Sequence, residues 1–290
     1  MSSRPVAKIV TAHQQTEGGG FIVKRPFPTQ GFQQLDPLLM LDEMGPVVYG
    51  PGEAMGAPDH PHRGFETVSY ILEGEAAHAD SAGHAGTLGP GDVQWMTAGA
   101  GVVHREMPSL RMQKEGGRMH GFQLWVNLPR AQKGVAPRYQ ELGSASIPEA
   151  TTPDGLASVR VIAGEALGAR ALVNTRTPIL YQHWRMKAGA SVEVPLPLDH
   201  NVGIYVFEGA LTVAGKTLAA GQLAVLGAGD SVTFSADAPA QALLLGGRPL
   251  GEPVAWGGPF VMNTREEVLT AFDDYRAGRM GKIPPEIVRA

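Results

Sequence analysis

Apolar residues along the chain come in short runs separated by glycine and proline, which is the pattern of β-strands joined by tight turns. The clearest runs are rich in branched and aromatic side chains and span residues 65–72, 93–96, 121–128, 202–207 and 241–245. The strongest helical pattern comes late, at residues 263–278, where a capping residue and two acids precede an apolar face. That face is predicted to consist of Val268, Leu269, Phe272 and Tyr275. The pattern therefore predicts many strands followed by a C-terminal helix.

Composition supports this interpretation. The 290 residues include 38 Gly and 23 Pro, about a fifth of the chain, which favours turn-rich β-structure over long helices. With 43% hydrophobic and 18% charged residues, the chain has enough apolar material for a folded core. Its length favours two domains over one.

Charge and cysteine content narrow the function classes. The formal net charge of −4 does not favour direct contact with nucleic acid. The absence of cysteine excludes disulfides and thiolate metal sites, so any metal must be held by histidine and carboxylate. The first residues lack the apolar core of a signal peptide, and no apolar stretch is long enough to span a membrane. We therefore expect a cytoplasmic protein without a membrane partner.

An internal repeat indicates that the strands form two similar barrels. The sequence YILEG at residues 70–74 is echoed by YVFEG at residues 205–209, an offset of 135. Farther along, Thr87, Leu88 and Gly91 recur at an offset of 130 as Thr217, Leu218 and Gly221, and a shorter hairpin loop in the second copy accounts for the difference. The polar segment 132–153 is the natural boundary. We expect one barrel in residues 1–135, and a second barrel with the helix in residues 136–290.

Four residues in the first copy have the spacing of metal ligands. His60 and His62 lie two apart, as do His104 and Glu106, so each pair would point to one face of a strand. The same alternation would also place Glu66 on the face of His60 and His62, which leaves Glu66 and Glu106 as competing carboxylates. Imidazole and carboxylate are ligands expected for a first-row divalent metal. The remaining histidines are expected to be ordinary core or surface residues, and they are His13, His78, His84, His120, His183 and His200.

The second copy serves as an internal control. The 135 offset places His60 and His62 on Pro195 and Pro197, and the 130 offset places His104 on Phe234 and Glu106 on Ala236. The second copy thus keeps the turn glycines and loses every candidate ligand. This difference predicts one metal site, in the first barrel.

Several longer motifs resemble the pirin family of bicupins over nearly the whole chain. The most specific blocks are DHPHRGFETVSYILEG (59–74), GHAGTLGPGDVQWMTAGAGVVHREMP (83–108) and GFQLWVNLP (121–129), with DPLLMLDEMGP (36–46) before them and GPFVMNTREE (258–267) after them. The resemblance implies an all-β bicupin of two tandem antiparallel barrels of the jelly-roll type, with a metal-binding N-terminal barrel and a C-terminal barrel that lacks ligands.

The resemblance also implies the ligand set His60, His62, His104 and Glu106, with Glu66 as a neighbour of undefined role. Iron(II) is the expected metal, one per chain, and Mn, Ni, Co or Cu are alternatives. Arg105 departs from relatives that carry a small residue there, and alternation predicts that its side chain points out of the barrel.

The implied activity is that of a quercetin 2,3-dioxygenase, which cleaves a flavonol with dioxygen. Glu106 is the catalytic candidate, because a ligand carboxylate beside the substrate hydroxyl can accept its proton. Phe65, Trp95, Met96, Met107 and Phe122 could line a substrate pocket, although we expect core packing for each of them.

The alternative function is an iron-dependent redox sensor that binds a transcription factor or a metabolic enzyme. In that case Arg63 and Arg105, beside the ligands, could report the oxidation state at the surface. Solvated or salt-bridged arginines are the plainer expectation for both.

Overall fold

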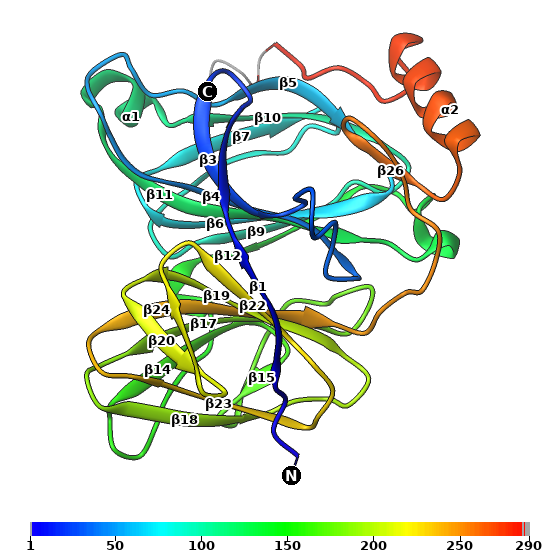
Figure 1. Ribbon diagram of the computed structural model, residues 1–290. Helices are drawn as coiled ribbons and strands as arrows, with labels where there is room; N and C mark the ends of the chain where they lie inside the picture. The colour runs from blue at the N-terminus through cyan, green and yellow to red at the C-terminus, as the bar shows by residue number, and fades with distance from the viewer. Residues whose placement is uncertain (1, 286, 288–290) are drawn as a thin grey trace. The chain divides into compact units, whose positions relative to one another are not determined.

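The computed structural model describes residues 2–285 and 287 (Figure 1). The chain divides into two compact units, and each is built around a seven-stranded and a four-stranded sheet. The first barrel comprises Gln14–Lys24, Met40–Ser144 and Gly251–Ala290, and the second comprises Met1–His13, Arg25–Leu39 and Ala145–Leu250. The predicted all-β architecture with a C-terminal helix is confirmed.

In the first barrel the two sheets curve toward each other around a shared interior (Figure 1). The larger sheet has the order β12 (Arg138–Leu142), β9 (Val93–Thr97), β6 (Phe65–Glu73), β11 (Gly117–Asn127), β4 (Leu38–Tyr49), β3 (Phe21–Phe27) and β2 (His13–Glu17). The smaller sheet has the order β5 (Ala57–His62), β10 (Val102–Pro108), β7 (Ala76–Asp80) and β8 (Ala85–Leu88). A separate hairpin joins β25 (Ala255–Gly257) to β26 (Phe260–Met262).

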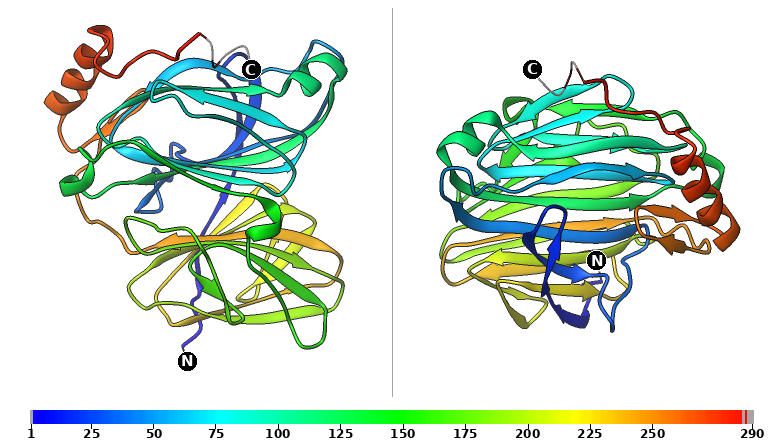
Figure 2. Two further views of the ribbon diagram at one scale, coloured as in Figure 1. Left: turned by 180° about the vertical axis from the view of Figure 1, so that it is seen from behind. Right: turned by 90° about the horizontal axis from the view of Figure 1, so that it is seen from above.

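The second barrel repeats this plan (Figure 2). Its larger sheet has the order β1 (Val6–Thr11), β22 (Gln222–Leu226), β19 (Asn201–Glu208), β24 (Ala240–Gly247), β17 (Ile179–Met186), β14 (Ala157–Ala163) and β13 (Glu149–Thr151). Its smaller sheet has the order β18 (Ala190–Pro195), β23 (Ser231–Ala236), β20 (Ala210–Val213) and β21 (Lys216–Ala219). The strands β15 (Glu165–Ala166) and β16 (Ala169–Arg170) form a small hairpin.

Both ends of the chain depart from a single division at residues 135 and 136. Strand β1 pairs with β22 and so belongs to the second barrel, with Ile9 opposite Ala224. The C-terminal segment joins the first barrel instead, because Phe260, Ala271 and other tail residues share a buried apolar cluster with Ala79 and Val103. Such pairings join residues far apart in sequence, which local patterning does not record.

The internal repeat is visible in the backbone. Gly91 N donates to Ile71 O at 2.7 Å, and Gly221 N donates to Val206 O at 2.8 Å. The two acceptors, Ile71 and Val206, are 135 residues apart, and the two donors, Gly91 and Gly221, are 130 residues apart, so the bonds match both offsets of the repeat. Both glycines have a positive φ, +86° and +84°, a backbone conformation that a side chain would strain.

The C-terminal helix α2 spans Arg265–Arg276, inside the predicted range. Thr264 caps it in a capping box with Glu267, as the sequence pattern predicts. Its buried residues are Val268 and Ala271, however, while Leu269 is 55% exposed, so the predicted apolar face is wrong in part. A second helix that the sequence did not predict, α1, spans Leu110–Glu115. Two short 3₁₀ turns lie at Arg130–Gln132 and Ser144–Ser146.

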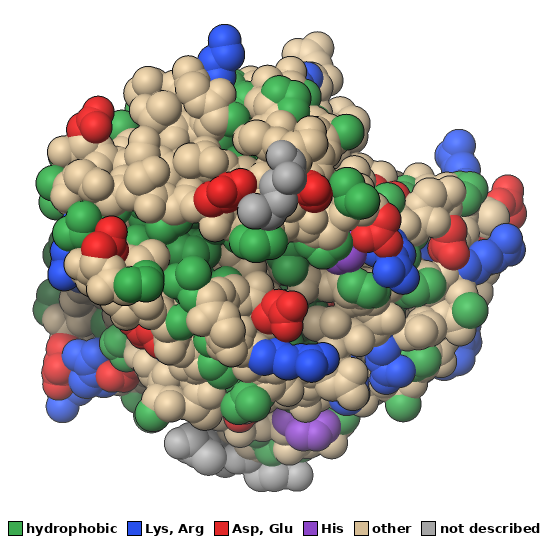
Figure 3. All heavy atoms as spheres, turned by 90° about the horizontal axis from the view of Figure 1, so that it is seen from below, with side chains coloured by type: hydrophobic (Ala, Val, Ile, Leu, Met, Phe, Trp, Pro, Cys, Tyr) green, Lys and Arg blue, Asp and Glu red, His purple; other side chains and the backbone are tan. Residues whose placement is uncertain are grey.

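Figure 3 shows acidic and basic side chains interspersed across one face, in keeping with the small net charge. No helix in the described part of the chain is both long and apolar enough to cross a membrane.

Candidate metal centre

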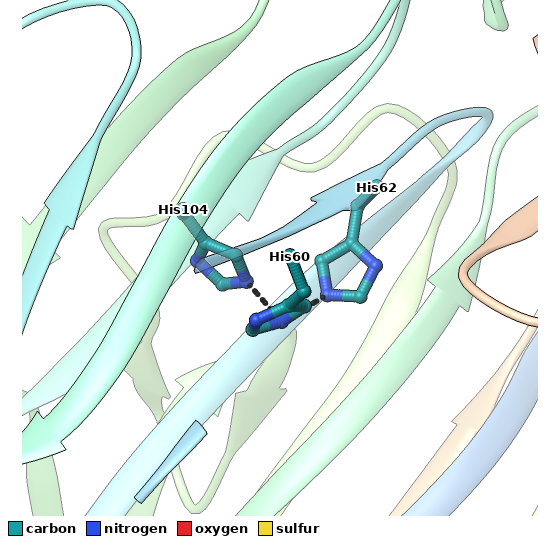
Figure 4. A group of neighbouring side chains, drawn as sticks. All are labelled: His60, His62 and His104. Atoms are coloured by element: carbon teal, nitrogen blue, oxygen red, sulfur yellow. Dashed lines mark hydrogen bonds between the residues drawn. The ribbon is translucent and has the colours of Figure 1, made fainter. Parts of the chain in front are cut away.

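Strand register brings three predicted ligands together. Strands β5 and β10 pair so that His60 lies directly opposite His104, and His62 lies one pair of positions farther along the same face. The Nε2 atom of His60 lies 3.1 Å from Nε2 of His62 and 2.9 Å from Nε2 of His104 (Figure 4). Ligand atoms of all three lie within 4.8 Å of one another.

These separations fit a metal ion. Two nitrogens bound at about 2.1 Å lie about 3.0 Å apart when they meet at right angles, and about 3.4 Å apart at a tetrahedral angle. The observed 2.9 Å and 3.1 Å match right angles, as in octahedral coordination. Three ring nitrogens so close together without a proton or cation between them would repel one another. The donor set is therefore suited to a divalent ion.

The hydrogen bonding and burial of these imidazoles also suit metal binding. The Nδ1 atom of His60 lies 2.7 Å from Pro58 O, and since a carbonyl can only accept, Nδ1 carries a proton and Nε2 is the atom that faces His62 and His104. Burial, followed by the neighbouring imidazoles, holds the pKa values of His62 and His104 well below the usual range. Both rings are therefore neutral at neutral pH.

Glu106 lies beside the histidines with both oxygens hydrogen-bonded. Ser69 Oγ donates to Oε1 at 2.7 Å, and Gln123 Nε2 donates to Oε2 at 2.7 Å. The distance from Oε2 to His104 Nε2 is 4.0 Å. The carboxylate thus faces the histidine group from the same strand as His104.

Glu66 does not share this face. Ser69 contacts Glu106, and on a regular strand Glu66 and Ser69 point to opposite sides. The carboxylate of Glu66 instead accepts from Thr97 Oγ1 at 2.5 Å. The expected alternation from His62 to Glu66 is wrong, because Gly64, with φ of +90°, ends one strand before the next begins.

Aromatic side chains enclose His62. Its ring lies edge-on to Phe65 and to Trp125, with centroids 5.1 Å away in each case, and Trp125 stacks on Trp256 at 5.5 Å. Phe65 is thus a neighbour of the site, as the sequence allowed, whereas Trp95, Met96 and Phe122 are fully buried in the core and Met107 is half-buried. The sequence did not mark Trp125, because its contact with His62 joins two strands that are far apart in sequence.

The turn that follows strand β5, which carries His60 and His62, is tied to distant segments. The Nζ atom of Lys133 donates to Gly64 O at 2.7 Å, to Asn127 Oδ1 at 2.7 Å and to Val261 O at 2.9 Å. Burial lowers the pKa of Lys133 to about 8. No sequence motif marked this lysine, since its three partners lie in three separate segments.

Both arginines beside the ligands form ion pairs, as the plainer expectation held. Arg63 pairs with Asp274 of α2 at 2.7 Å. Arg105 pairs with Asp59 through its Nε at 2.6 Å, on the outer side of the strand. Arg105 therefore does not enter the site.

Strand register gives the counterparts of the four residues in the second barrel. Strand β23 pairs with β18 through Phe234 and Val192, as β10 pairs with β5 through His104 and His60. The counterparts of His60, His62, His104 and Glu106 are accordingly Val192, Val194, Phe234 and Ala236, all buried in one apolar core. Pro195 and Pro197 were the wrong counterparts by three residues, because five residues separate β18 from β19 but only two separate β5 from β6.

Fold and site together define a bicupin with a three-histidine group in one barrel. The family model named Pirin matches residues 20–126, and the Pirin C-terminal cupin domain matches residues 181–281. The chain belongs to the pirin family. It is 45% identical to a pirin-like protein of Solanum lycopersicum over 286 residues, covering 96% of this chain and 94% of that one.

Two further relatives extend the comparison. The chain is 44% identical to pirin of Homo sapiens over 287 residues, covering 97% of this chain and 95% of that one. A crystal structure of quercetin 2,3-dioxygenase from Acinetobacter baumannii superposes with a TM-score of 0.92 at 35% identity, covering 98% of this chain and all of that one.

Proposed function

We propose that this chain is a metal-dependent flavonol 2,3-dioxygenase that holds one divalent ion, iron(II), with His60, His62, His104 and Glu106. The observation that carries the proposal is the approach of three imidazoles, with His60 Nε2 lying 3.1 Å from His62 Nε2 and 2.9 Å from His104 Nε2. The likeness to quercetin 2,3-dioxygenase supports the reaction class. Mn, Ni, Co or Cu could occupy the same donors.

The bound metal would supply a Lewis acid for the substrate hydroxyl and a redox partner for dioxygen. The protein supplies the base. Glu106 accepts the proton of the flavonol 3-hydroxyl at a carboxylate oxygen, because each oxygen holds one hydrogen bond and keeps a second lone pair. Phe65 and Trp125 surround His62 with apolar surface that excludes water from this side of the site.

Oxygen consumption tests the proposal. The chain is loaded with iron(II) without air and then mixed with quercetin and dioxygen, beside the variant His104→Ala. We expect many turnovers per metal in the parent and none in the variant. A parent that binds one metal per chain and consumes no more than one equivalent of dioxygen would refute the dioxygenase function.

The alternative is a redox-sensing regulatory protein that binds a transcription factor or a metabolic enzyme, and one structural link favours it as second candidate. Val261 N donates to Arg63 O at 3.1 Å, and the Arg63 side chain pairs with Asp274 on α2. A one-unit change of charge at the metal is thereby connected to a surface helix. Hydrogen exchange of α2 amides that differs between the iron(II) and iron(III) forms would support this function, and identical exchange would contradict it.

A further inference from the structure

A row of polar side chains crosses the inner face of the larger sheet in the first barrel. Four directly paired positions on adjacent strands form it: Gln123 on β11, Ser69 on β6, Gln94 on β9 and Glu141 on β12. Ser69 and Gln94 are 4% and 2% exposed. Buried polar groups reduce stability unless they are hydrogen-bonded, so such a row requires specific partners.

The row divides into two parts with different partners. Ser69 and Gln123 both donate to Glu106, each to one carboxylate oxygen. Gln94 donates instead to Glu141 at 3.2 Å, and no hydrogen bond links it to Glu106 among the contacts of the described residues. Two amides on the same face, the buried Gln94 and the half-buried Gln123, therefore differ in whether they reach the candidate ligand.

The second barrel shows that the fold does not need this row. Ile204, Ala224 and Leu244 pair in the register of Ser69, Gln94 and Gln123. All three are fully buried in the apolar core. Where Glu106 is replaced by Ala236, its hydrogen-bond donors are replaced by hydrocarbon as well. The polar row thus accompanies the carboxylate and is not required for the barrel.

The orientation of the Gln123 amide is fixed by a second contact. Trp125 Nε1 donates to Gln123 Oε1 at 3.2 Å. An indole N–H can only donate, so the amide oxygen must face Trp125 and the amide nitrogen must face Glu106. Trp125 in turn packs against the His62 ring. Gln123 therefore joins the environment of one histidine to the carboxylate.

We propose that Gln123, assisted by Ser69, is a positioning residue that fixes the Glu106 carboxylate for metal binding. The inference rests on the metal centre proposed above but not on flavonol turnover. Two neutral donors occupy one lone pair on each oxygen and add no positive charge to compete with a cation. The remaining lone pairs then point in a fixed direction, and the site does not have to order the carboxylate when the metal binds.

The test replaces each amide by the residue at its counterpart in the second barrel. Gln123→Leu removes a contact with Glu106, and Gln94→Ala is the matched control in the same row. Cobalt(II) is the probe, its affinity measured by competition with a chelator and its coordination by visible absorption. We expect Gln123→Leu to weaken binding about 10- to 100-fold and to change the spectrum, and Gln94→Ala to leave both unchanged.

A third variant guards against misfolding of Gln123→Leu. Ser69→Ala removes one hydrogen bond from a neutral donor and a single oxygen atom, and we expect about two- to tenfold weaker binding. Thermal melting of the metal-free proteins shows whether each variant is folded. The positioning role would be overturned if folded Gln123→Leu bound cobalt with the affinity and spectrum of the parent. If Gln123→Leu does not fold, the same result in Ser69→Ala would overturn it. Equal weakening of cobalt binding in Gln94→Ala would also overturn it. A parent that binds no cobalt would instead refute the metal centre itself.

Discussion

Lys133 offers the sharpest test of how the turn after strand β5 is held. It is 3% exposed, and its ammonium donates to two main-chain carbonyls and one side-chain amide oxygen. One of these carbonyls belongs to Gly64, two residues after His62, and another belongs to Val261 in the tail. Lys133→Met keeps the aliphatic stem and removes all three donors. The change therefore isolates the polar contribution of the side chain.

Two opposing terms set the size of the effect. A hydrogen bond to a charged group contributes about 1.5–3 kcal/mol, and three are lost. Removing the buried ammonium also relieves a desolvation penalty of about 3 kcal/mol at neutral pH, since its pKa falls from 10.5 to about 8 and each pKa unit corresponds to about 1.4 kcal/mol. We expect Lys133→Met to lower the free energy of unfolding by about 1.5–6 kcal/mol at pH 7.

The pH dependence has a definite sign. Because the pKa is lower in the folded protein, the unfolded chain binds more protons between the folded and unfolded values, and stability rises with pH there. Between pH 7.5 and pH 9.5 the parent should gain about 2 kcal/mol over Lys133→Met in urea unfolding. Lys114→Met, on the exposed surface of α1, is the control and should differ from the parent by about 0.5 kcal/mol or less. If the difference in free energy of unfolding between the parent and Lys133→Met were the same at both pH values, the buried-ammonium reasoning would be refuted.

Three further predictions concern the ligands and the tail. His104→Ala should lose its metal while the metal-free protein melts within a few degrees of the parent, as metal analysis and calorimetry would show. Glu66→Gln should keep one metal per chain and Glu106→Gln should not, so equal metal loss in the two would show that the carboxylate is wrongly assigned. The hydrogen bond from Arg63 holds the pKa of Asp274 below its usual range. Asp274→Asn should therefore speed hydrogen exchange in α2 at neutral pH, whereas Asp273→Asn, at an exposed position, should not. The difference in exchange rate between Asp274→Asn and the parent should shrink as the pH falls and Asp274 is protonated.

Local patterning predicted what depends on local spacing. The strands, the repeat and the HxH and HxE pairs follow from alternation and turn residues, and the histidine group forms where these patterns place it. Glu66 was misplaced because a single glycine between two strands resets the alternation. The counterparts of His60 and His62 were misplaced because a three-residue difference in one connection is invisible to a fixed offset.

The supporting residues were harder to find because their partners are distant in sequence. Lys133 contacts Gly64 and Val261, and neither partner is predictable from spacing. Gln123 and Ser69, in contrast, do leave a signal in the sequence. The 135 offset aligns Ser69 with Ile204, so a polar residue in one copy faces an apolar residue in the other. Inner-face positions that are polar in one copy and apolar in the other thus mark the row beside Glu106.

The asymmetry between the barrels leads to a last prediction, on metal removal. A ligand that binds only the folded state stabilises it by about 2.7 kcal/mol when present at 100 times its dissociation constant. The first barrel should receive this stabilisation through β5 and β10, whereas the apolar counterparts on β18 and β23 have no group that binds a metal. Chelation should therefore speed hydrogen exchange in β5 and β10 about 100-fold, provided these amides exchange by unfolding of that barrel, and should leave β18 and β23 unchanged. Equal acceleration in both pairs of strands would have one of two meanings: the metal is not confined to the three-histidine group, or the two barrels unfold as one cooperative unit. Metal analysis of His104→Ala distinguishes them, because complete loss of metal in that variant shows that the metal is confined to the three-histidine group.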